Sequence, residues 1–195
     1  AVVFNKEKAE KFLGGVGAVA NQLSALVKDV ELVTYLGEFD LEENLKFVKE
    51  NLSDNVSLNF VVKEDSPTIK KTRFIDSYWK SRLFETYEMN DRPLEEDEKW
   101  IKDDLISKLQ NSFAIDYGHG FLEGNENVFS VNVQSNSGNR GYNFISKYKN
   151  SKLYIIDEGE LRLEMRDKHS EPMLLAKNLQ EVIGGVVVVT RGSHG

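Results

Sequence analysis

Residues 12–40 read FLGGVGAVANQLSALVKDVELVTYLGEFD, and this stretch decides the fold. Gly14, Gly15 and Gly17 open a segment whose apolar residues recur at helical spacing. The hydrophobic run over residues 30–36 predicts a buried strand directly after that helix. Glycines let backbone amides approach a ligand closely, and the free N–H groups of a helix start attract negative charge. The stretch therefore predicts a turn, a helix and a strand, with a polyol or an anion bound at the turn.

The composition is that of a folded protein with one sizeable core. Apolar residues make up 40% and charged residues 29% of the 195 residues. The net charge of −7 disfavours extended contact with nucleic acid or with an anionic membrane. The absence of cysteine excludes disulfides and thiolate metal sites, and no apolar run approaches the roughly 20 residues of a membrane span. We therefore expect a cytoplasmic protein without nucleic-acid or membrane partners.

Most of the remaining chain alternates between helical and strand patterns, which predicts an α/β fold. Asp40 and Glu43 have the spacing of a capping box, which predicts a helix that ends near residues 51–54. Further helices are predicted over 95–111, 142–148, 161–167 and 172–183, and strands over 112–115, 128–133, 153–156 and 186–189. The link over 117–127 is at or below the length that a crossover helix needs between parallel strands.

Residues 56–88 change to a period of two and carry no helical pattern. Three consecutive strands predict an antiparallel meander, inserted in the α/β core as a small flap. Its many aromatic residues suit a lid over a ligand or a dimer contact. Lys71 and Arg73 lie on one face of the middle strand, where they either meet an anionic substrate group or guard an exposed edge.

Polar residues at the predicted strand ends are candidates for ligand contacts, because open α/β folds bind ligands there. His119 lies between two glycines and is either a phosphate contact or a solvated loop residue. Asp157, Glu158 and Glu160 could hold hydrated Mg²⁺, or they could simply begin a helix.

The glycine turn also permits a different interpretation. Residues 15–20 match the G-x-G-x-x-A pattern of dinucleotide sites, and Glu38 follows about 20 residues later. That pattern requires a buried strand directly before it, whereas Lys6 to Lys11 is a charged segment. A third possibility is that the glycines only permit tight helix packing.

Taken together, these features resemble the ribokinase/PfkB-type carbohydrate kinases, in particular the branch of heptose-phosphate kinases and of kinase-like domains joined to nucleotidyltransferases. The resemblance spans nearly all of the chain, and the order of the matching pieces is its most specific feature. These pieces are Gly14-Gly15 with the helix after it, Gly37-Glu38-Phe39-Asp40, Lys71-Thr72-Arg73, Asp116-Tyr117-Gly118-His119-Gly120, residues 132–134, Asp157-Glu158 and residues 186–195.

The resemblance implies a three-layer α/β/α sandwich of ribokinase-like type with a small antiparallel β lid. Residues 1–55 and 89–195 would form an incomplete core, and residues 56–88 a lid that also serves as a dimer contact. It implies ATP and Mg²⁺ as cofactors, a sugar or sugar phosphate as substrate, a homodimer through the lid, and a fused or partner nucleotidyltransferase domain.

The resemblance also assigns roles to single residues. Gly14, Gly15 and Asn21 would line the sugar pocket, with Lys71 and Arg73 on the lid strand. Asp116 and His119 would lie near the phosphates, Thr190 and Gly192 near the nucleotide, and Glu158 near the metal.

Several positions depart from the family pattern. The chain stops before the G-A-G-D signature, whose aspartate is the catalytic base, and the first strand is missing ahead of Ala1. Ala18 stands where many members have asparagine, and the N-x-x-E spacing at the metal strand becomes Glu158-Gly159-Glu160-Leu161. The sequence therefore predicts a fragment of an ATP-dependent carbohydrate kinase, with no catalytic base within it. The alternative is a non-catalytic domain that binds a sugar or a nucleotide, or dimerises, within a larger enzyme.

Overall fold

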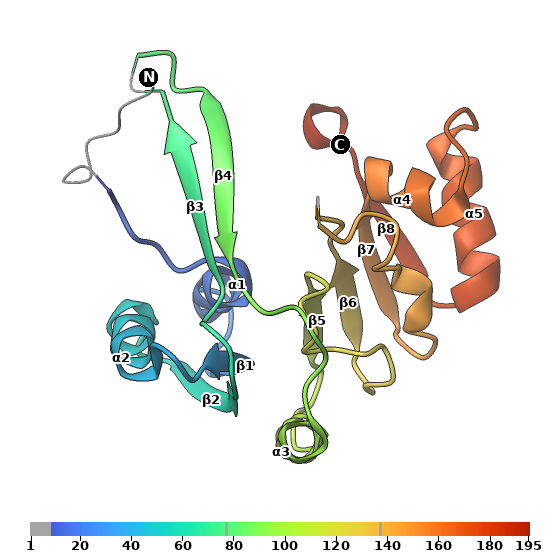
Figure 1. Ribbon diagram of the computed structural model, residues 1–195. Coiled ribbons are helices and arrows are strands. Elements are labelled where there is room, and N and C mark those ends of the chain that lie inside the picture. The colour runs from blue at the N-terminus through green and yellow to red at the C-terminus, as the bar shows by residue number, and fades with distance from the viewer. Residues whose placement is uncertain (1–8, 77, 137) are drawn as a thin grey trace. The chain divides into compact units, whose positions relative to one another are not determined.

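The computed structural model describes residues 9–76, 78–136 and 138–195 (Figure 1). The chain divides into two compact units, Ala1–Asn90 and Asp91–Gly195. Each unit combines helices with a parallel sheet, which confirms the predicted α/β class.

The first unit contains one β-α-β element. Strands β1 (Val30–Gly37) and β2 (Val56–Lys63) pair in parallel along their whole length, and helix α2 (Leu41–Asn51) connects them. Helix α1 (Gly15–Ser24) precedes β1 and packs on it, as the glycine turn and the apolar periodicity predicted. The prediction of a three-stranded meander is therefore wrong for its first strand. Alternation along Val56–Lys63 indicates a half-buried strand but not its partner, and the preceding helix returns the chain parallel to β1.

The antiparallel part of the unit is a two-stranded sheet. Within the described residues, strands β3 (Lys70–Ile75) and β4 (Arg82–Glu88) pair only with each other (Figure 1). Their register places Lys71 opposite Tyr87 and Arg73 opposite Glu85. Phe74 and Phe84 face each other across the strands with ring centroids 4.3 Å apart. Lys71 and Arg73 share one face of the sheet, as predicted.

Two loops lock together at the carboxyl ends of β1 and β2. The Gly37 amide donates a 3.0 Å hydrogen bond to Thr68 Oγ1, and the Thr68 amide donates a 3.1 Å bond to Asp40 Oδ1. Asp40 precedes α2 but makes no side-chain cap, so the predicted capping box is wrong. Its carboxylate is used by a loop that lies 28 residues away in sequence, a contact that local spacing cannot reveal.

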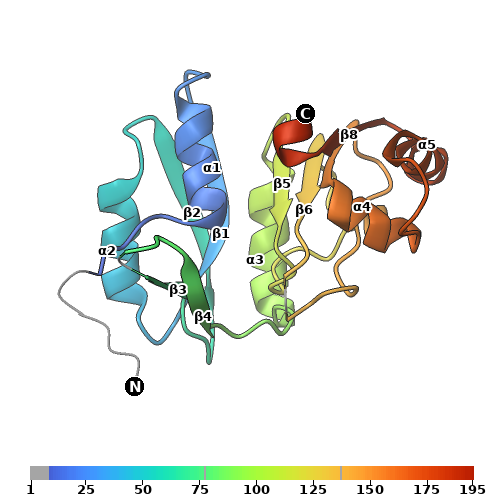
Figure 2. The same cartoon turned by 90° about the horizontal axis from the view of Figure 1, so that it is seen from above.

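The second unit is built on four parallel strands in the order β5-β6-β7-β8. Helices α4 and α5 pack against each other, α4 also packs on β7 and α5 on β8 (Figure 2). Residues 142–148 contain only the 3₁₀ turn η2 in place of the predicted helix. The elements are α3 (Glu96–Ser107), β5 (Phe113–Asp116), β6 (Ser130–Val133), η2 (Ile145–Lys147), β7 (Leu153–Asp157), α4 (Glu158–Met165), α5 (Pro172–Ile183), β8 (Val186–Thr190) and η3 (Gly192–His194).

The connection from β5 to β6 contains no helix, although the two strands are parallel neighbours. A buried ion pair orders this loop instead: Lys102 Nζ lies 2.9 Å from Glu126 Oε1, and both side chains are almost fully buried. Burial alone would raise the pKa of Glu126, but the amide of Glu123 and the ammonium of Lys102 hold it below its ordinary range. Both carboxylate oxygens of Glu126 thus have hydrogen-bond donors, as a desolvated carboxylate requires.

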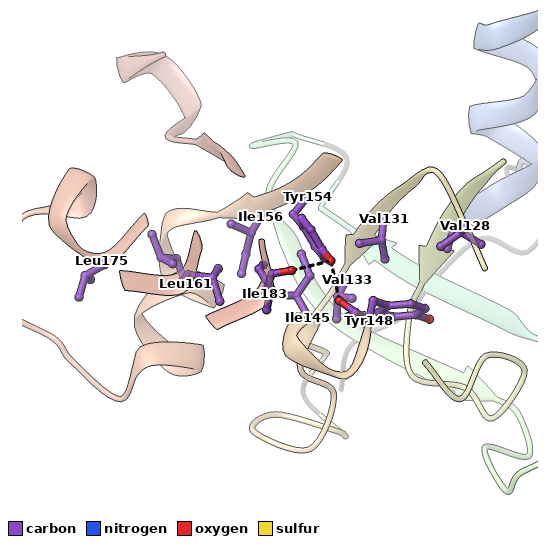
Figure 3. Packing of buried hydrophobic residues seen from close by; sticks show 12 residues of the cluster. Val128, Val131, Val133, Ile145, Tyr148, Tyr154, Ile156, Leu161, Leu175 and Ile183 are labelled. Carbon is purple, nitrogen blue, oxygen red and sulfur yellow. Dashed lines mark hydrogen bonds between the residues drawn. The ribbon is translucent and has the colours of Figure 1, made fainter. Parts of the chain in front are cut away.

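Tyr154 ties the core of the second unit together (Figure 3). Its side chain is fully buried, and its hydroxyl donates a 2.7 Å hydrogen bond to the Tyr148 carbonyl. The same oxygen accepts a 3.2 Å bond from the Ser151 amide. One hydroxyl therefore joins β7 to the segment before it, inside a cluster of aliphatic side chains that includes Val131, Val133, Ile145, Ile156, Leu161, Leu175 and Leu179.

Gly37→Ala tests the locked loops of the first unit. A Cβ at this position would lie 2.1 Å from the Pro67 carbonyl carbon and 2.3 Å from the Thr68 amide nitrogen, and neither backbone atom can move aside easily. We expect a loss of at least about 2 kcal/mol of unfolding free energy, read as faster amide exchange in β1 and β2. Gly14→Ala is the matched control, since nothing lies within 4 Å of its Cβ position. Equal amide exchange rates in the two variants would contradict the close approach of the residue 67–68 backbone to Gly37.

Tyr154→Phe tests the hydroxyl at the core. The substitution leaves a buried carbonyl and a buried amide without their partner, which costs about 1–3 kcal/mol. Denaturant unfolding should show this loss, whereas Tyr142→Phe, at a side chain exposed to 87%, should show none. A Tyr154→Phe protein as stable as the Tyr142→Phe control would show that the hydroxyl is dispensable.

Candidate functional site

The glycine turn at the start of α1 is open to a ligand. Gly14 and Gly15 are exposed, and Gly15 has a φ of +51°, a conformation that glycine adopts without strain. None of the side chains that the structure describes caps this helix end, and its first turn carries no acidic residue. Its first backbone N–H groups are therefore available to an oxygen-rich ligand.

Asn21 has a structural role within the first unit. Its Nδ2 donates a 2.8 Å hydrogen bond to the Asn51 carbonyl, and its Oδ1 accepts a 2.9 Å bond from the Ser53 amide. Both ends of the amide thus join α1 to the segment that ends α2. This arrangement separates Asn21 from the open turn at Gly14 and Gly15.

Lys71 and Arg73 belong to a cationic cluster on the β3–β4 sheet. Glu85 Oε2 lies 3.1 Å from Lys71 Nζ, while Glu85 Oε1 lies 2.8 Å from Arg73 Nε and 2.7 Å from Arg82 Nη1. Burial alone would raise the pKa of Glu85, but hydrogen bonds from Arg73, Arg82 and Lys71 lower it to about 2. Three cations around one carboxylate leave two positive charges in excess, so this face can receive an anion.

The second candidate region is the carboxyl edge of the four-stranded sheet. Because β5 to β8 are all parallel, Asp116, Val133, Asp157 and Thr190 end their strands at the same edge. The residues predicted to contact the nucleotide, the phosphates and the metal all lie in this unit, at or just after these ends. Open α/β sheets bind ligands at such an edge.

Asp116 is buried and fully engaged at this edge. Its Oδ2 lies 2.5 Å from Lys147 Nζ and accepts a 2.9 Å hydrogen bond from the Tyr148 hydroxyl. Its Oδ1 accepts a 2.7 Å bond from the Gly118 amide. Burial, together with the neighbouring charge of Asp116, raises the pKa of the Tyr148 hydroxyl, so this hydroxyl stays protonated. Asp116 therefore shapes the loop that follows it.

Asparagines fasten the loop that carries His119. Asn136 and Asn139 donate hydrogen bonds of 2.8 and 2.7 Å to the Tyr117 carbonyl. His119 stacks nearly parallel to Tyr117, with ring centroids 6.1 Å apart. Gly118 has a φ of +67°, and a Cβ there would lie 2.1 Å from Asn139 Nδ2. The loop after β5 is thus held to the loop after β6 by side-chain amides.

Glu158 and the residues around Thr190 meet at the ends of β7 and β8. Asp157 is paired with Thr190 in the sheet register, and Glu158 Oε2 lies 2.9 Å from Arg191 Nε. Glu158 Oε1 lies 2.8 Å from Arg162 Nη2. Hydrogen bonds from Arg191 and Arg162 hold the pKa of Glu158 below its ordinary range. Gly192, with a φ of +55°, begins η3 one residue later.

Helix α4 begins at Glu158, earlier than predicted, because Asp157 and Glu160 form a capping box. Glu160 accepts hydrogen bonds from the amides of Ser135, at 2.8 Å, and Asp157, at 3.2 Å. Burial raises the pKa of Glu160 despite these bonds. The D-x-x-E spacing at 157–160 was a readable signal for this helix start.

The acidic residues of this edge do not assemble a metal centre. Among the described residues, no group of three or more His, Cys, Asp or Glu side chains could hold a metal ion. Both oxygens of Glu158 are engaged by arginines, so this residue does not fit the part of a metal ligand in this arrangement. No helix within the described ranges is long and apolar enough to cross a membrane.

Sequence reasoning missed the residues that organise both regions. Arg82 and Glu85 complete the cluster around Lys71, and Arg162 and Arg191 surround Glu158. Strand alternation could have placed Glu85 beside Arg73 once the hairpin register was known. The pairing of Glu158 with Arg191 spans 33 residues and has no local signal.

The low pKa of Glu85 makes the β3–β4 sheet sensitive to acid. The folded-state pKa of about 2 lies below the ordinary value of 4.5. The cluster therefore contributes its full stabilisation above pH 4.5 and loses it as the pH falls toward 2. Carbon-detected NMR of the Glu85 carboxyl should show a midpoint well below 4.5, and Glu85→Gln should abolish this dependence of the sheet. A titration midpoint of Glu85 at or above 4.5 would show that the three cations do not stabilise its carboxylate.

Comparison with known proteins gives relatives in sequence and in structure. The chain is 26% identical over 180 residues to Bifunctional protein HldE of Aliarcobacter butzleri (strain RM4018), covering 86% of this chain and 37% of that protein. No family model matches the sequence.

Two solved structures show the same fold. The tetrameric inhibited form of phosphofructokinase-2 from Escherichia coli matches 93% of this chain with a TM-score of 0.69 and 14% identity. A putative phosphofructokinase from Staphylococcus aureus matches 95% with a TM-score of 0.56 and 12% identity. The chain spans 63% and 62% of those chains. In sequence and in fold, the chain is therefore related to the ribokinase/PfkB-type carbohydrate kinases.

Proposed function

We propose that this chain is part of an ATP-dependent carbohydrate kinase that phosphorylates a hydroxyl of a sugar or sugar phosphate. The observation that carries the proposal is the relationship to HldE and to phosphofructokinase-2 over nearly the whole chain. The two candidate regions supply the chemistry that such a reaction needs, since each presents positive charge or backbone N–H groups to an oxygen-rich ligand.

The sugar substrate is assigned to the first unit. Gly14 and Gly15 offer backbone N–H groups to sugar hydroxyls, and the cluster of Lys71, Arg73 and Arg82 offers charge-assisted hydrogen bonds to a phosphate. Because Asn21 is engaged by backbone groups, we leave it out of the sugar contacts.

The nucleotide is assigned to the carboxyl edge of the second unit. Thr190 and Gly192 lie where the chain leaves β8, and His119 lies on the loop after β5. Phosphoryl transfer depends mainly on positioning and on stabilising negative charge, and these loops supply hydroxyl, backbone and imidazole donors for that purpose. Mg²⁺ usually accompanies ATP in such kinases, but Glu158 does not fit as its ligand because arginines engage both of its oxygens.

The β3–β4 sheet is proposed to act as a lid and as a homodimer contact. An isolated two-stranded sheet has little stability of its own. Ile75, Leu83 and Phe84 are nonetheless exposed on it, which supports a partner surface. This assignment narrows the expected lid of residues 56–88 to its antiparallel part, while residues 1–55 and 89–195 stay with the core. HldE is named as bifunctional, which supports a second functional domain, and we propose a nucleotidyltransferase as this fused or partner domain and a cytoplasmic location.

A non-catalytic binding domain is the second candidate. It is favoured by one observation, that Asp116 and Glu158 are both engaged by cationic side chains of the chain itself. In that case ligands would bind at the same residues without turnover.

Release of ADP separates these two functions. The full-length natural protein should release ADP from Mg-ATP in the presence of one member of a panel of hexose and heptose phosphates, and much less without it. Nucleotide binding without any sugar-dependent release would favour the binding domain. Absence of both binding and release would reject both proposals.

Lys71→Ala tests the substrate cluster. It removes one of three cations around Glu85, so the KM for the sugar phosphate should rise about tenfold, which equals about 1.4 kcal/mol. Lys70→Ala is the matched control, because Lys70 is on the other face and pairs with Glu88 at 2.8 Å. Equal KM values for the two variants would mean that Lys71 does not bind the substrate and only guards an exposed strand edge.

A further inference from the structure

Glu158 sits between two arginines that are bound in different ways. Arg162 is fully engaged: its Nε and Nη2 lie 3.1 and 2.8 Å from Glu158 Oε1, and its Nη1 donates a 3.0 Å bond to the Ser170 carbonyl. Arg162 alone is therefore sufficient to neutralise Glu158.

Arg191 is bound by one edge only. Its Nε donates a 2.9 Å hydrogen bond to Glu158 Oε2, and among the described residues no partner contacts its Nη1 or Nη2. The side chain is 44% exposed, whereas that of Glu158 is 27% exposed. The carboxylate thus holds one edge of the guanidinium and leaves the two terminal nitrogens without a hydrogen-bond partner among the described residues.

The position of Arg191 is set by the sheet. Thr190 ends β8 and is in register with Asp157, which places Arg191 directly beyond the carboxyl edge. The Arg191 amide donates a 2.8 Å hydrogen bond to the Gly195 carbonyl across η3, which fixes the backbone at this point. Asp157 lies at the same edge, so the two arginines balance the carboxylates of Asp157 and Glu158.

We propose that Arg191 is an anion-binding residue that takes an oxygen of a polyphosphate, and that Glu158 is its positioning residue. The terminal nitrogens of a guanidinium match two phosphate oxygens, and a guanidinium held in place loses less conformational entropy on binding. Identification of the anion as the nucleotide's polyphosphate rests on the proposed function, whereas the anion site itself does not.

The test measures binding of inorganic pyrophosphate, and of ATP without metal, to the full chain by calorimetry. Arg191→Ala should weaken the binding of both anions about tenfold. Arg191→Lys keeps the charge but loses the paired terminal nitrogens, so it should weaken binding less. Lys177→Ala is the control, because it removes an exposed positive charge from α5 and should change neither. Equal affinity in Arg191→Ala and Lys177→Ala, or no pyrophosphate binding by the wild type, would overturn the proposal.

Glu158→Gln tests the positioning role separately. The Nε–H NMR signal of Arg191 should exchange slowly in the wild type and rapidly in this variant, while the effect of Mg²⁺ on ATP affinity should stay the same. Loss of that Mg²⁺ effect would make Glu158 a metal ligand and overturn its role as a positioning residue. Because none of these measurements contains a sugar, pyrophosphate binding through Arg191 without sugar-dependent ADP release would reject the kinase and leave this inference standing.

Discussion

The parallel alignment of β5 to β8 is the constraint on which the second unit depends. Parallel strands require a return connection after each strand, so every carboxyl end opens into a loop at one edge of the sheet. Asp116, Asp157 and Thr190 therefore stand at one edge although up to 74 residues separate them in the sequence, from 116 to 190. The core beneath this edge is held by Tyr154, whose hydroxyl joins two segments of backbone.

Two carboxylates of this chain, those of Glu85 and Glu158, are each surrounded by cationic side chains of the same chain. Glu85 gathers Lys71, Arg73 and Arg82, and Glu158 gathers Arg162 and Arg191. Around Glu85 the cations outnumber the carboxylate, so the local charge is positive there although the whole chain is acidic. The excess of cations around Glu85 and the fixed guanidinium of Arg191 are the two places where we propose that anionic ligands bind.

Local sequence signals predicted the elements well and their partners poorly. Helix α5 and strand β1 were found within a residue of their bounds, because apolar periodicity and flanking glycines are properties of a short segment. Strand β2 was found but paired wrongly, since alternation shows a half-buried strand and not its neighbour. Asp40 failed as a cap because a distant amide competes for its carboxylate.

The same limit applies to the candidate site. The family resemblance singled out Thr190 and Gly192, but the significance of Arg191 depends on Glu158, which only the folded sheet brings beside it. The predicted metal role considered Glu158 together with Asp157 and Glu160, whereas the fold places two arginines beside Glu158.

The most direct test of this account is a map of the backbone amides that move when ATP is titrated into the ¹⁵N-labelled protein. We predict that the largest shifts in the second unit fall in residues 117–120 and 190–194, at the ends of β5 and β8. Shifts confined to other surfaces of that unit, with residues 190–194 unchanged at saturation, would contradict a nucleotide site at the carboxyl edge of the sheet.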